Sequence, residues 1–182
     1  MDDIPLLKVV IVGDGAVGKT SLVRRYCEGK FFASRVATIG VDFYTQRVQL
    51  PDRRVKLSIW DMAGQERFQV VRAGFYRGSL AAALVYDVTS LTSLGNLKRW
   101  RDELLQALPG QPLVAVGNKV DLPRVVRPEL GRAAAAYLGG PYVETSALSG
   151  TGVAELFETL ATLAAHARFG KVANHSGPEA NR

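Results

Sequence analysis

The residues best suited to chemistry lie in a glycine-rich segment near the N-terminus. Residues 13–20 read GDGAVGKT, which fits the pattern G-x-x-x-x-G-K-[ST] of a phosphate-binding loop. Glycines let such a loop wrap closely and point its N–H groups inward, and the N-terminus of the following helix favours an anion. Lys19 is placed to reach terminal phosphates and Thr20 to ligate Mg²⁺. The candidate nucleotide contacts here are Gly13, Asp14, Gly15, Ala16, Val17, Gly18, Lys19, Thr20 and Ser21.

A second candidate site, NKVD at 118–121, follows a buried apolar run. The Asp121 carboxylate can accept two hydrogen bonds from the N1–H and exocyclic amine of guanine, a donor pair that adenine lacks. Asn118 can tie this loop to the phosphate loop. The segment SAL at 146–148 is placed to contact the guanine carbonyl oxygen through its backbone. The candidate base contacts are Asn118, Lys119, Asp121, Ser146, Ala147 and Leu148.

Hydrophobic patterning predicts the elements that hold these loops. Short, nearly unbroken apolar runs are typical of buried strands. They occur at 6–12, 80–86, 112–117 and 141–144, and a hairpin is predicted from 41–50 and 54–61. Apolar residues spaced three and four apart predict helices. These cover 18–28, 91–108, 127–138 and 153–169. This alternation predicts an α/β fold of the P-loop class, with a six-stranded, mostly parallel sheet, one antiparallel edge strand and helices on both faces.

Composition limits the class of protein. The 182 residues suit one domain, and 47% hydrophobic with 22% charged residues excludes disorder throughout. The net charge of +6 is spread along the chain, so we expect no nucleic-acid partner. Cys27 is the only cysteine, which rules out a disulfide within the chain and indicates a reducing compartment. We expect one nucleotide-binding domain over 1–169 and a disordered tail over 170–182.

Four further segments add a family resemblance to these loops. They read ATIGVDF at 37–43, WDMAGQERF at 60–68, FYRGS at 75–79 and LVYDVT at 84–89. With them the chain resembles the small GTPases of the Ras superfamily, and the Rab family most closely, over about residues 6–169. The resemblance implies a G domain that binds GTP and GDP with Mg²⁺, hydrolyses GTP by attack of water and recruits effectors in the GTP state.

The resemblance also implies roles for residues near the nucleotide. Thr38 would ligate Mg²⁺ and sense the γ-phosphate, and Asp61 would hold Mg²⁺ through water. The Gly64 N–H would bond the γ-phosphate, Gln65 would orient the attacking water, and Phe31 would pack against guanine. Two loops, at about 31–42 and 63–76, would be released when the γ-phosphate is lost.

Partner proteins are implied in the same way. Effectors would read the aromatic side chains of Phe43, Trp60 and Phe75, whereas simple packing is the alternative role for these residues. An exchange factor and a GTPase-activating protein are further expected partners. Rab proteins are usually prenylated on C-terminal cysteines, but this chain ends in PEANR. We therefore expect a cytoplasmic protein without a stable lipid anchor that reaches membranes transiently through partners. We also expect a monomer.

Three positions depart from the family pattern. Arg35 lies three residues before Thr38, where Rab and Ras proteins usually have tyrosine. The run RVAT at 35–38 resembles the first switch of heterotrimeric G-protein α subunits, in which an arginine at this spacing acts in cis on the transition state. Arg35 is thus a candidate catalytic residue with Lys19 and Gln65, and an exposed, solvated arginine is the alternative. Leu148 replaces a lysine, and Met62 replaces the threonine of WDTAGQ.

Two other function classes are compatible with a phosphate loop. A guanine-nucleotide-binding scaffold that does not cycle would use the same two loops, but residue types suited to hydrolysis are also present. A nucleoside monophosphate kinase would need a second-substrate lid with several arginines, and the sequence has no insert of that kind between its predicted strands.

Overall fold

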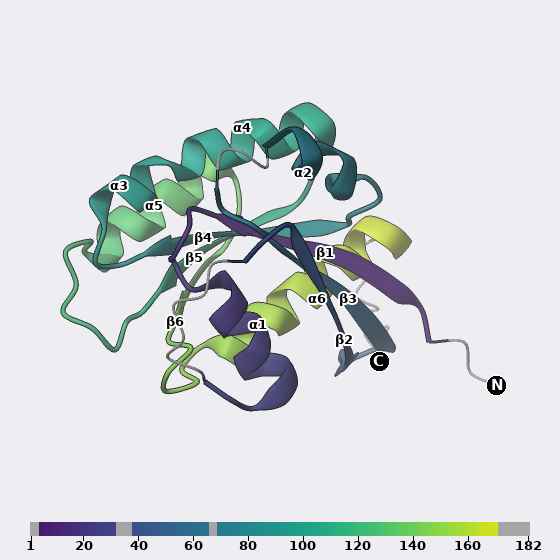
Figure 1. Ribbon diagram of the computed structural model, residues 1–182. Helices are drawn as coiled ribbons and strands as arrows, with labels where there is room; N and C mark the ends of the chain where they lie inside the picture. The colour runs from purple at the N-terminus through teal and green to yellow at the C-terminus, as the bar shows by residue number, and fades with distance from the viewer. Residues whose placement is uncertain (1–3, 32–37, 66–68, 171–182) are drawn as a thin grey trace, which may run out of the picture.

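The computed structural model describes residues 4–31, 38–65 and 69–170. Its centre is a six-stranded sheet in the order β2-β3-β1-β4-β5-β6 (Figure 1). Strands β2 and β3 pair antiparallel, and the other neighbours are parallel. The strands are β1 (Leu6–Gly13), β2 (Val41–Gln49), β3 (Arg54–Met62), β4 (Ala81–Asp87), β5 (Leu113–Asn118) and β6 (Tyr142–Thr145). The predicted fold class, including the antiparallel edge strand, is confirmed.

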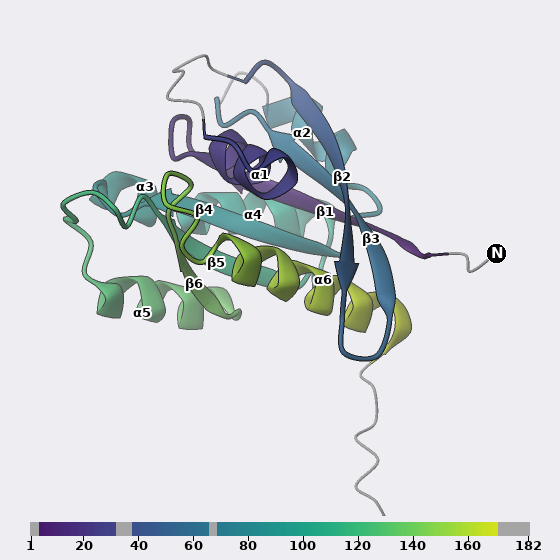
Figure 2. The same ribbon diagram turned by 90° about the horizontal axis from the view of Figure 1, so that it is seen from below.

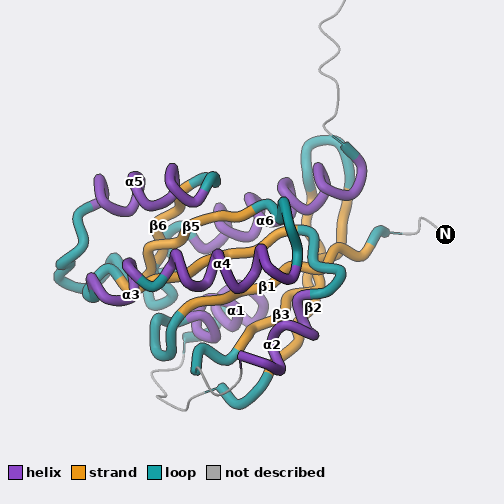
Figure 3. Tube along the Cα trace, turned by 90° about the horizontal axis from the view of Figure 1, so that it is seen from above, coloured by secondary structure: helices purple, strands orange, loops and turns teal. Residues whose placement is uncertain are grey.

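Helices cover both faces of the sheet. Helices α1 and α6 pack on one face, and the other four in the described part of the chain pack on the opposite face (Figures 1 and 3). The bounds are α1 (Lys19–Glu28), α2 (Gln69–Tyr76), α3 (Leu91–Gly95), α4 (Leu97–Ala107), α5 (Pro128–Leu138) and α6 (Val153–Phe169). Within the described ranges, no helix is long and apolar enough to cross a bilayer.

Strand β1 shows why the apolar runs become central strands. Its alternate residues enter two different cores, so nearly every position must be apolar. Val9 and Ile11 lie in the core shared with α1 and α6, whereas Val10 and Val12 lie in the core shared with α4 and α5. The chain leaves this buried strand at Gly13, and the phosphate loop therefore starts from a fixed point.

The helical prediction over 91–108 differs from the structure at Asn96. The chain forms α3 and α4 with a one-residue interruption there, although the Asn96 backbone N–H still bonds the Thr92 carbonyl at 3.0 Å. Gly95 is a weak helix former, and the Asn96 side chain donates to the carboxylate of Asp14 at 2.7 Å. The interruption therefore lies where the helix contacts the phosphate loop.

Helix α2 differs from the expectation of a switch loop over residues 63–76. Residues Gln69–Tyr76 are helical. The helix places Arg72 and Tyr76, four residues apart, against the same carboxylate of α4. A contact between segments about thirty residues apart thus stabilises a short helix whose own sequence signal is weak. The predicted tail lies almost wholly outside the described residues, since only Gly170 is described.

Candidate functional site

The phosphate loop joins β1 to α1 and leaves the first N–H groups of α1 available to a ligand. Gly18 is the N-cap, with a left-handed φ of 99°, and no side chain among the described residues caps this helix end. A Cβ on Gly18 would lie 2.3 Å from Nδ2 of Asn118. Glycine is required at this position because of both its backbone conformation and the close approach of the neighbouring loop. Uncapped N–H groups at a helix N-terminus favour a bound anion.

Lys19 lies across the phosphate loop. Its ammonium donates to the carbonyl oxygens of Gly13 at 2.7 Å and Asp14 at 2.6 Å. Burial lowers the pKa of Lys19 to about 8, against the opposing effects of Asp61 and Asp14. The cation is thus held inside the curve of the loop, where a phosphate chain cradled by the loop would meet it.

Three oxygen-bearing side chains meet beside Lys19. The hydroxyls of Thr20 and Thr38 lie 2.7 Å apart, and the Thr20 hydroxyl also donates to Asp61. The other carboxylate oxygen of Asp61 is buried without a hydrogen-bond partner among the described residues, and burial raises the Asp61 pKa to about 6. Such hard oxygen donors, one of them unsatisfied, fit Mg²⁺, which takes few protein ligands and completes its shell with water and phosphate. Within the described ranges, no group of three or more His, Cys, Asp or Glu side chains could hold a metal by itself.

The segment after β3 packs directly on the phosphate loop. A Cβ on Gly64 would lie 2.4 Å from the backbone carbon of Asp14 and 2.5 Å from the carbonyl oxygen of Gly13. Gln65 follows with a half-buried side chain. Lys19 and Gly64 thus contact the same two loop residues, and the backbone of Gly64 lies beside the place where a terminal phosphate would sit.

The NKVD segment is tied to the phosphate loop, as predicted for Asn118. Its Nδ2 donates to the Val17 carbonyl at 2.9 Å, and its Oδ1 accepts from the Thr145 hydroxyl at 3.0 Å. Lys119 has a left-handed φ of 71°, donates to the Ala16 carbonyl at 2.7 Å and pairs with Asp87 at 2.6 Å. A strained backbone that is held from several sides is typical of a ligand-binding loop.

The predicted base contacts converge at the carboxyl ends of β5 and β6. The Ser146 hydroxyl donates to one carboxylate oxygen of Asp121 at 2.6 Å. Asp121 is exposed, so its carboxylate remains accessible to a base. Ala147 is buried, whereas Leu148 is half exposed. Phe31, just beyond α1, is 37% exposed. Ligands of open α/β sheets bind at this edge.

Sequence reasoning missed a buried charged cluster behind residues 63–65. Arg72 of α2 bonds Glu103 of α4 twice, Nε to Oε1 at 2.8 Å and Nη2 to Oε2 at 3.0 Å. Its remaining Nη1 donates to the carbonyls of Ala63 at 3.0 Å and Gln65 at 2.7 Å. The Tyr76 hydroxyl donates to Glu103 at 2.6 Å. Arg72 therefore connects both neighbours of Gly64 to α4. Only the isolated arginine in QVVRAGFY hinted at this role.

Asp14 makes a second connection between the phosphate loop and α4. Its carboxylate accepts from Asn96 at 2.7 Å, from the indole N–H of Trp100 at 2.8 Å and from Arg99 at 3.3 Å. The guanidinium of Arg72 lies 4.4 Å from the centre of the Trp100 ring. One tryptophan on α4 thus contacts both the phosphate loop and the arginine that holds the segment around Gly64.

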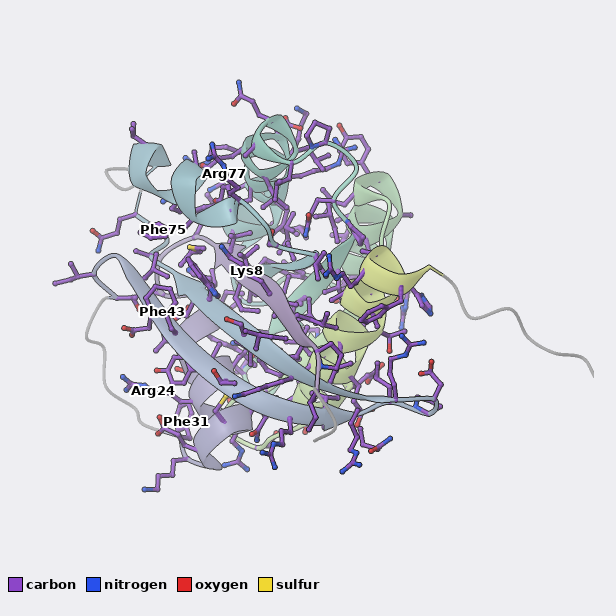
Figure 4. All side chains as sticks on the ribbon, turned by 90° about the vertical axis from the view of Figure 1, so that its right-hand side faces the viewer. Lys8, Arg24, Phe31, Phe43, Phe75 and Arg77 are labelled. Carbon is purple, nitrogen blue, oxygen red and sulfur yellow. The ribbon has the colours of Figure 1, made fainter. Side chains whose placement is uncertain are left out.

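The three predicted effector-contacting aromatics form one cluster, with one ring each from β2, β3 and α2. Phe43 meets Trp60 edge-on with ring centres 4.5 Å apart, and Trp60 lies 5.8 Å from Phe75. Phe43 is 59% exposed. The Lys8 ammonium lies 3.4 Å above the Trp60 ring. Figure 4 shows Lys8 on the same side of the molecule as Phe43 and Phe75. Arg35, a candidate catalytic residue, lies outside the described residues.

Comparison with known proteins gives a consistent family. The Ras family model matches residues 8–166. Ras-related protein Rab7 of Pisum sativum is 50% identical over 166 residues, covering 86% of this chain and 81% of the relative. Ras-related protein RABG3f of Arabidopsis thaliana has the same identity and coverage. Ras-related protein Rab7 of Cenchrus ciliaris is 49% identical over 165 residues, covering 85% of this chain and 80% of the relative.

Proposed function

The chain belongs to the Ras family and is a Rab-like GTPase, and on this premise we propose that it works as a nucleotide-dependent switch. It binds GTP and GDP with Mg²⁺, hydrolyses GTP to GDP and phosphate, and recruits effector proteins in the GTP state. The proposal depends most on Lys19 and Gly64, which contact the same residues of the phosphate loop from two directions.

The geometry supports hydrolysis by positioning and charge stabilisation rather than through a covalent enzyme intermediate. Lys19 neutralises charge on the terminal phosphates, the Gly64 N–H bonds the γ-phosphate, and Gln65 orients a water for in-line attack. Thr20, Thr38 and, through water, Asp61 would hold Mg²⁺, which would supply positive charge to the β- and γ-phosphates. The Arg72 contacts with the carbonyls of Ala63 and Gln65 fix the segment that bears these groups.

Guanine selectivity rests on Asp121. Ser146 orients one carboxylate oxygen, and the carboxylate can accept from the N1–H and exocyclic amine of the base. Asn118 and Lys119 hold this loop against the phosphate loop through hydrogen bonds. The base-binding loop and the phosphate-binding loop therefore keep a fixed position relative to each other.

Partner recognition uses the cluster of Phe43, Trp60 and Phe75, which borders both switch segments. An exchange factor and a GTPase-activating protein control the cycle. We place this activity in the cytoplasm, with transient membrane contact through partners. Flotation with liposomes tests that location, because strong binding by the protein alone contradicts it.

Single-turnover GTP hydrolysis with product analysis tests the proposed function. The wild type is expected to release phosphate and GDP, and Gln65→Leu to slow this release at least about tenfold. A nucleotide that stays intact on the protein would identify a scaffold that does not cycle, and would overturn the proposal.

The same assay decides between the two roles of Arg35. An arginine acting in cis gives a wild-type rate of about 10⁻² s⁻¹ and a fall of at least about tenfold in Arg35→Ala. A wild-type rate of about 4 × 10⁻⁴ s⁻¹ that Arg35→Ala leaves unchanged identifies a solvated loop residue.

A further inference from the structure

The outer face of the β2–β3 hairpin has an unusual arrangement of charge. In the antiparallel register, Arg47 lies directly opposite Lys56. Directly opposed side chains on one face have Cβ atoms about 5 Å apart, and like charges at such positions destabilise the pairing. Both side chains are exposed. Among the described residues, neither has an ion-pair partner within salt-bridge distance.

Among the described residues of β1, β2 and β3, the rest of this face adds positive charge and no negative charge. The pairing registers place Gln49 opposite Arg54, Thr45 opposite Ser58, and Leu6 and Lys8 of β1 beside Lys56 and Ser58. No aspartate or glutamate occurs at these positions. Asp52 lies in the turn and pairs with Arg53 at 2.8 Å. We call the outward-facing side chains of Lys8, Arg47, Arg54 and Lys56 the basic ladder.

The basic ladder continues into the aromatic cluster on the same face. Phe43 lies opposite Trp60, four residues along each strand from the Arg47–Lys56 pair, a separation of about 14 Å. Lys8 joins the two parts, because its ammonium lies above the Trp60 ring and donates to the Arg77 carbonyl at 2.8 Å. Figure 4 shows Lys8 between Phe43 and the segment of Phe75 and Arg77, and Figure 2 shows the hairpin at the open edge of the sheet.

From this arrangement we propose that the β2–β3–β1 face docks an acidic protein segment that also supplies an apolar anchor. The anchor packs on Phe43, and carboxylates about 14 Å away lie between Arg47 and Lys56. An extended segment of about four residues or a helix of about nine spans that distance. The anion relieves the repulsion between the opposed cations, which accounts for a pair that is unfavourable in the free protein.

The chemistry of the face favours a protein over a phosphate-rich partner. A lipid headgroup or nucleic-acid backbone would use the cations and leave the aromatic cluster uncovered. Lys8 lies over the Trp60 ring and Phe43 meets its edge, so Trp60 offers little open surface on which a base could stack. An apolar side chain, by contrast, fits beside Phe43, which is 59% exposed.

The anchor half of this surface rests on the proposed function, because the aromatic cluster borders the switch segments. The Arg47–Lys56 pair lies within the hairpin, away from the phosphate loop. Its contribution to binding is therefore the same in the GDP form and in the form loaded with a non-hydrolysable GTP analogue. Nucleotide content and GTP hydrolysis, measured on the same samples, show separately whether the switch operates.

The test uses the full chain and a fluorescein-labelled hexaglutamate peptide ending in Leu-Leu, followed by fluorescence anisotropy. Binding is expected to weaken between about 50 and 150 mM NaCl. Lys56→Glu is the informative variant, since it turns the like-charge pair into an opposite-charge pair with Arg47. It is expected to raise the melting temperature and to lower peptide affinity at least about fivefold. If the pair had only a structural role, Lys56→Glu would change the melting temperature and leave the peptide affinity unchanged.

The double variant Arg47→Glu with Lys56→Glu is expected to weaken binding at least about tenfold. Its matched control is Arg127→Glu with Arg132→Glu, at the N-cap and in the body of α5, near the other edge of the sheet. This control changes net charge equally and leaves affinity within about twofold. Equal loss in both double variants overturns the proposal in favour of nonspecific attraction.

Vesicles containing phosphatidylserine complete the design. The proposal is overturned in favour of a membrane contact if two results occur together. The wild type sediments with these vesicles but does not bind the peptide, and the hairpin variants no longer sediment.

Discussion

Arg72 and Glu103 form a two-bonded ion pair in the protein interior, with exposed side-chain fractions of 3% and 8%. The pair joins α2 to α4 behind residues 63–65. The arginine has a third nitrogen, which bonds the carbonyls of Ala63 and Gln65. One side chain thus has a structural and a positioning task, and substitutions can separate them.

We expect Arg72→Met to destabilise the protein by about 3–5 kcal/mol, because Glu103 is left charged and buried without its partner. Denaturant unfolding of the GDP-bound protein measures this loss. Hydrolysis is expected to slow by about tenfold to a hundredfold, since the residues on both sides of Gly64 lose their connection to α4.

The double variant Arg72→Met with Glu103→Gln separates the two effects. No uncompensated buried charge remains, and the new side-chain amide can still accept from Tyr76, so most of the stability is expected to return. Hydrolysis stays slow because the carbonyl contacts are still missing. Recovery of both properties together would mean that Arg72 has no positioning role.

Gly64→Ala tests the contact between Gly64 and the phosphate loop. The new Cβ would lie 2.4–2.5 Å from backbone atoms of Gly13, Asp14 and Gly15, none of which is a flexible side-chain end. The segment is expected to move away, so that hydrolysis falls at least about tenfold while GDP affinity changes little. Gly74→Ala is the control, because no described atom lies close to that glycine's Cβ position. It is expected to leave the rate unchanged and to stabilise α2 by about 0.5–1 kcal/mol.

Trp100→Phe removes one support of the phosphate loop and keeps an aromatic ring under Arg72. The lost hydrogen bond, from the indole to Asp14, is charge-assisted and is worth about 1.5–3 kcal/mol. GDP dissociation is therefore expected to accelerate about tenfold or more, as measured by displacement of a fluorescent GDP analogue. The matched control is Trp60→Phe, which removes an indole bond to Ser58 on the outer face. Equal acceleration in both variants would contradict a specific role for the Asp14 contact.

The sequence predicted the features that depend on local signals. The phosphate loop is contiguous, its glycines are required by close approach at Gly18, and the apolar runs that precede it become central strands. The tie from Asn118 to the phosphate loop was predictable because the carboxyl ends of parallel strands meet at one edge of the sheet.

Features that depend on distant contacts were not predictable from one sequence. Arg72 and Glu103 are separated by 31 positions, and Asp14 and Trp100 by 86. Taken alone in the sequence, each of these residues indicates only an ordinary surface group or a core aromatic. Helix α2 was missed for the same reason, because its stability comes from packing on α4. The interruption of the expected single helix at Asn96 follows a weak helix former, Gly95, and coincides with the hydrogen bond from the Asn96 side chain to the distant Asp14.

Cys27 allows a test of how firmly α1 is packed in the absence of any catalytic readout. Burial raises the pKa of this half-buried thiol from 9.0 to about 11, with a smaller contribution from Glu28. The thiolate is the reactive form, so at about pH 8 its population in the folded protein is about a hundredfold lower than in the unfolded chain. Reaction with a disulfide reagent is expected to be slower by about that factor in the folded protein than in denaturant. Because the pKa of Cys27 is higher in the folded protein than in the unfolded chain, ionisation of the thiol lowers the stability of the folded protein as pH rises above about 9. Well below pH 9 the thiol does not affect stability. A folded protein that reacts as fast as the denatured chain would show that α1 opens readily, and Cys27→Ser, which removes the only thiol, gives the blank rate.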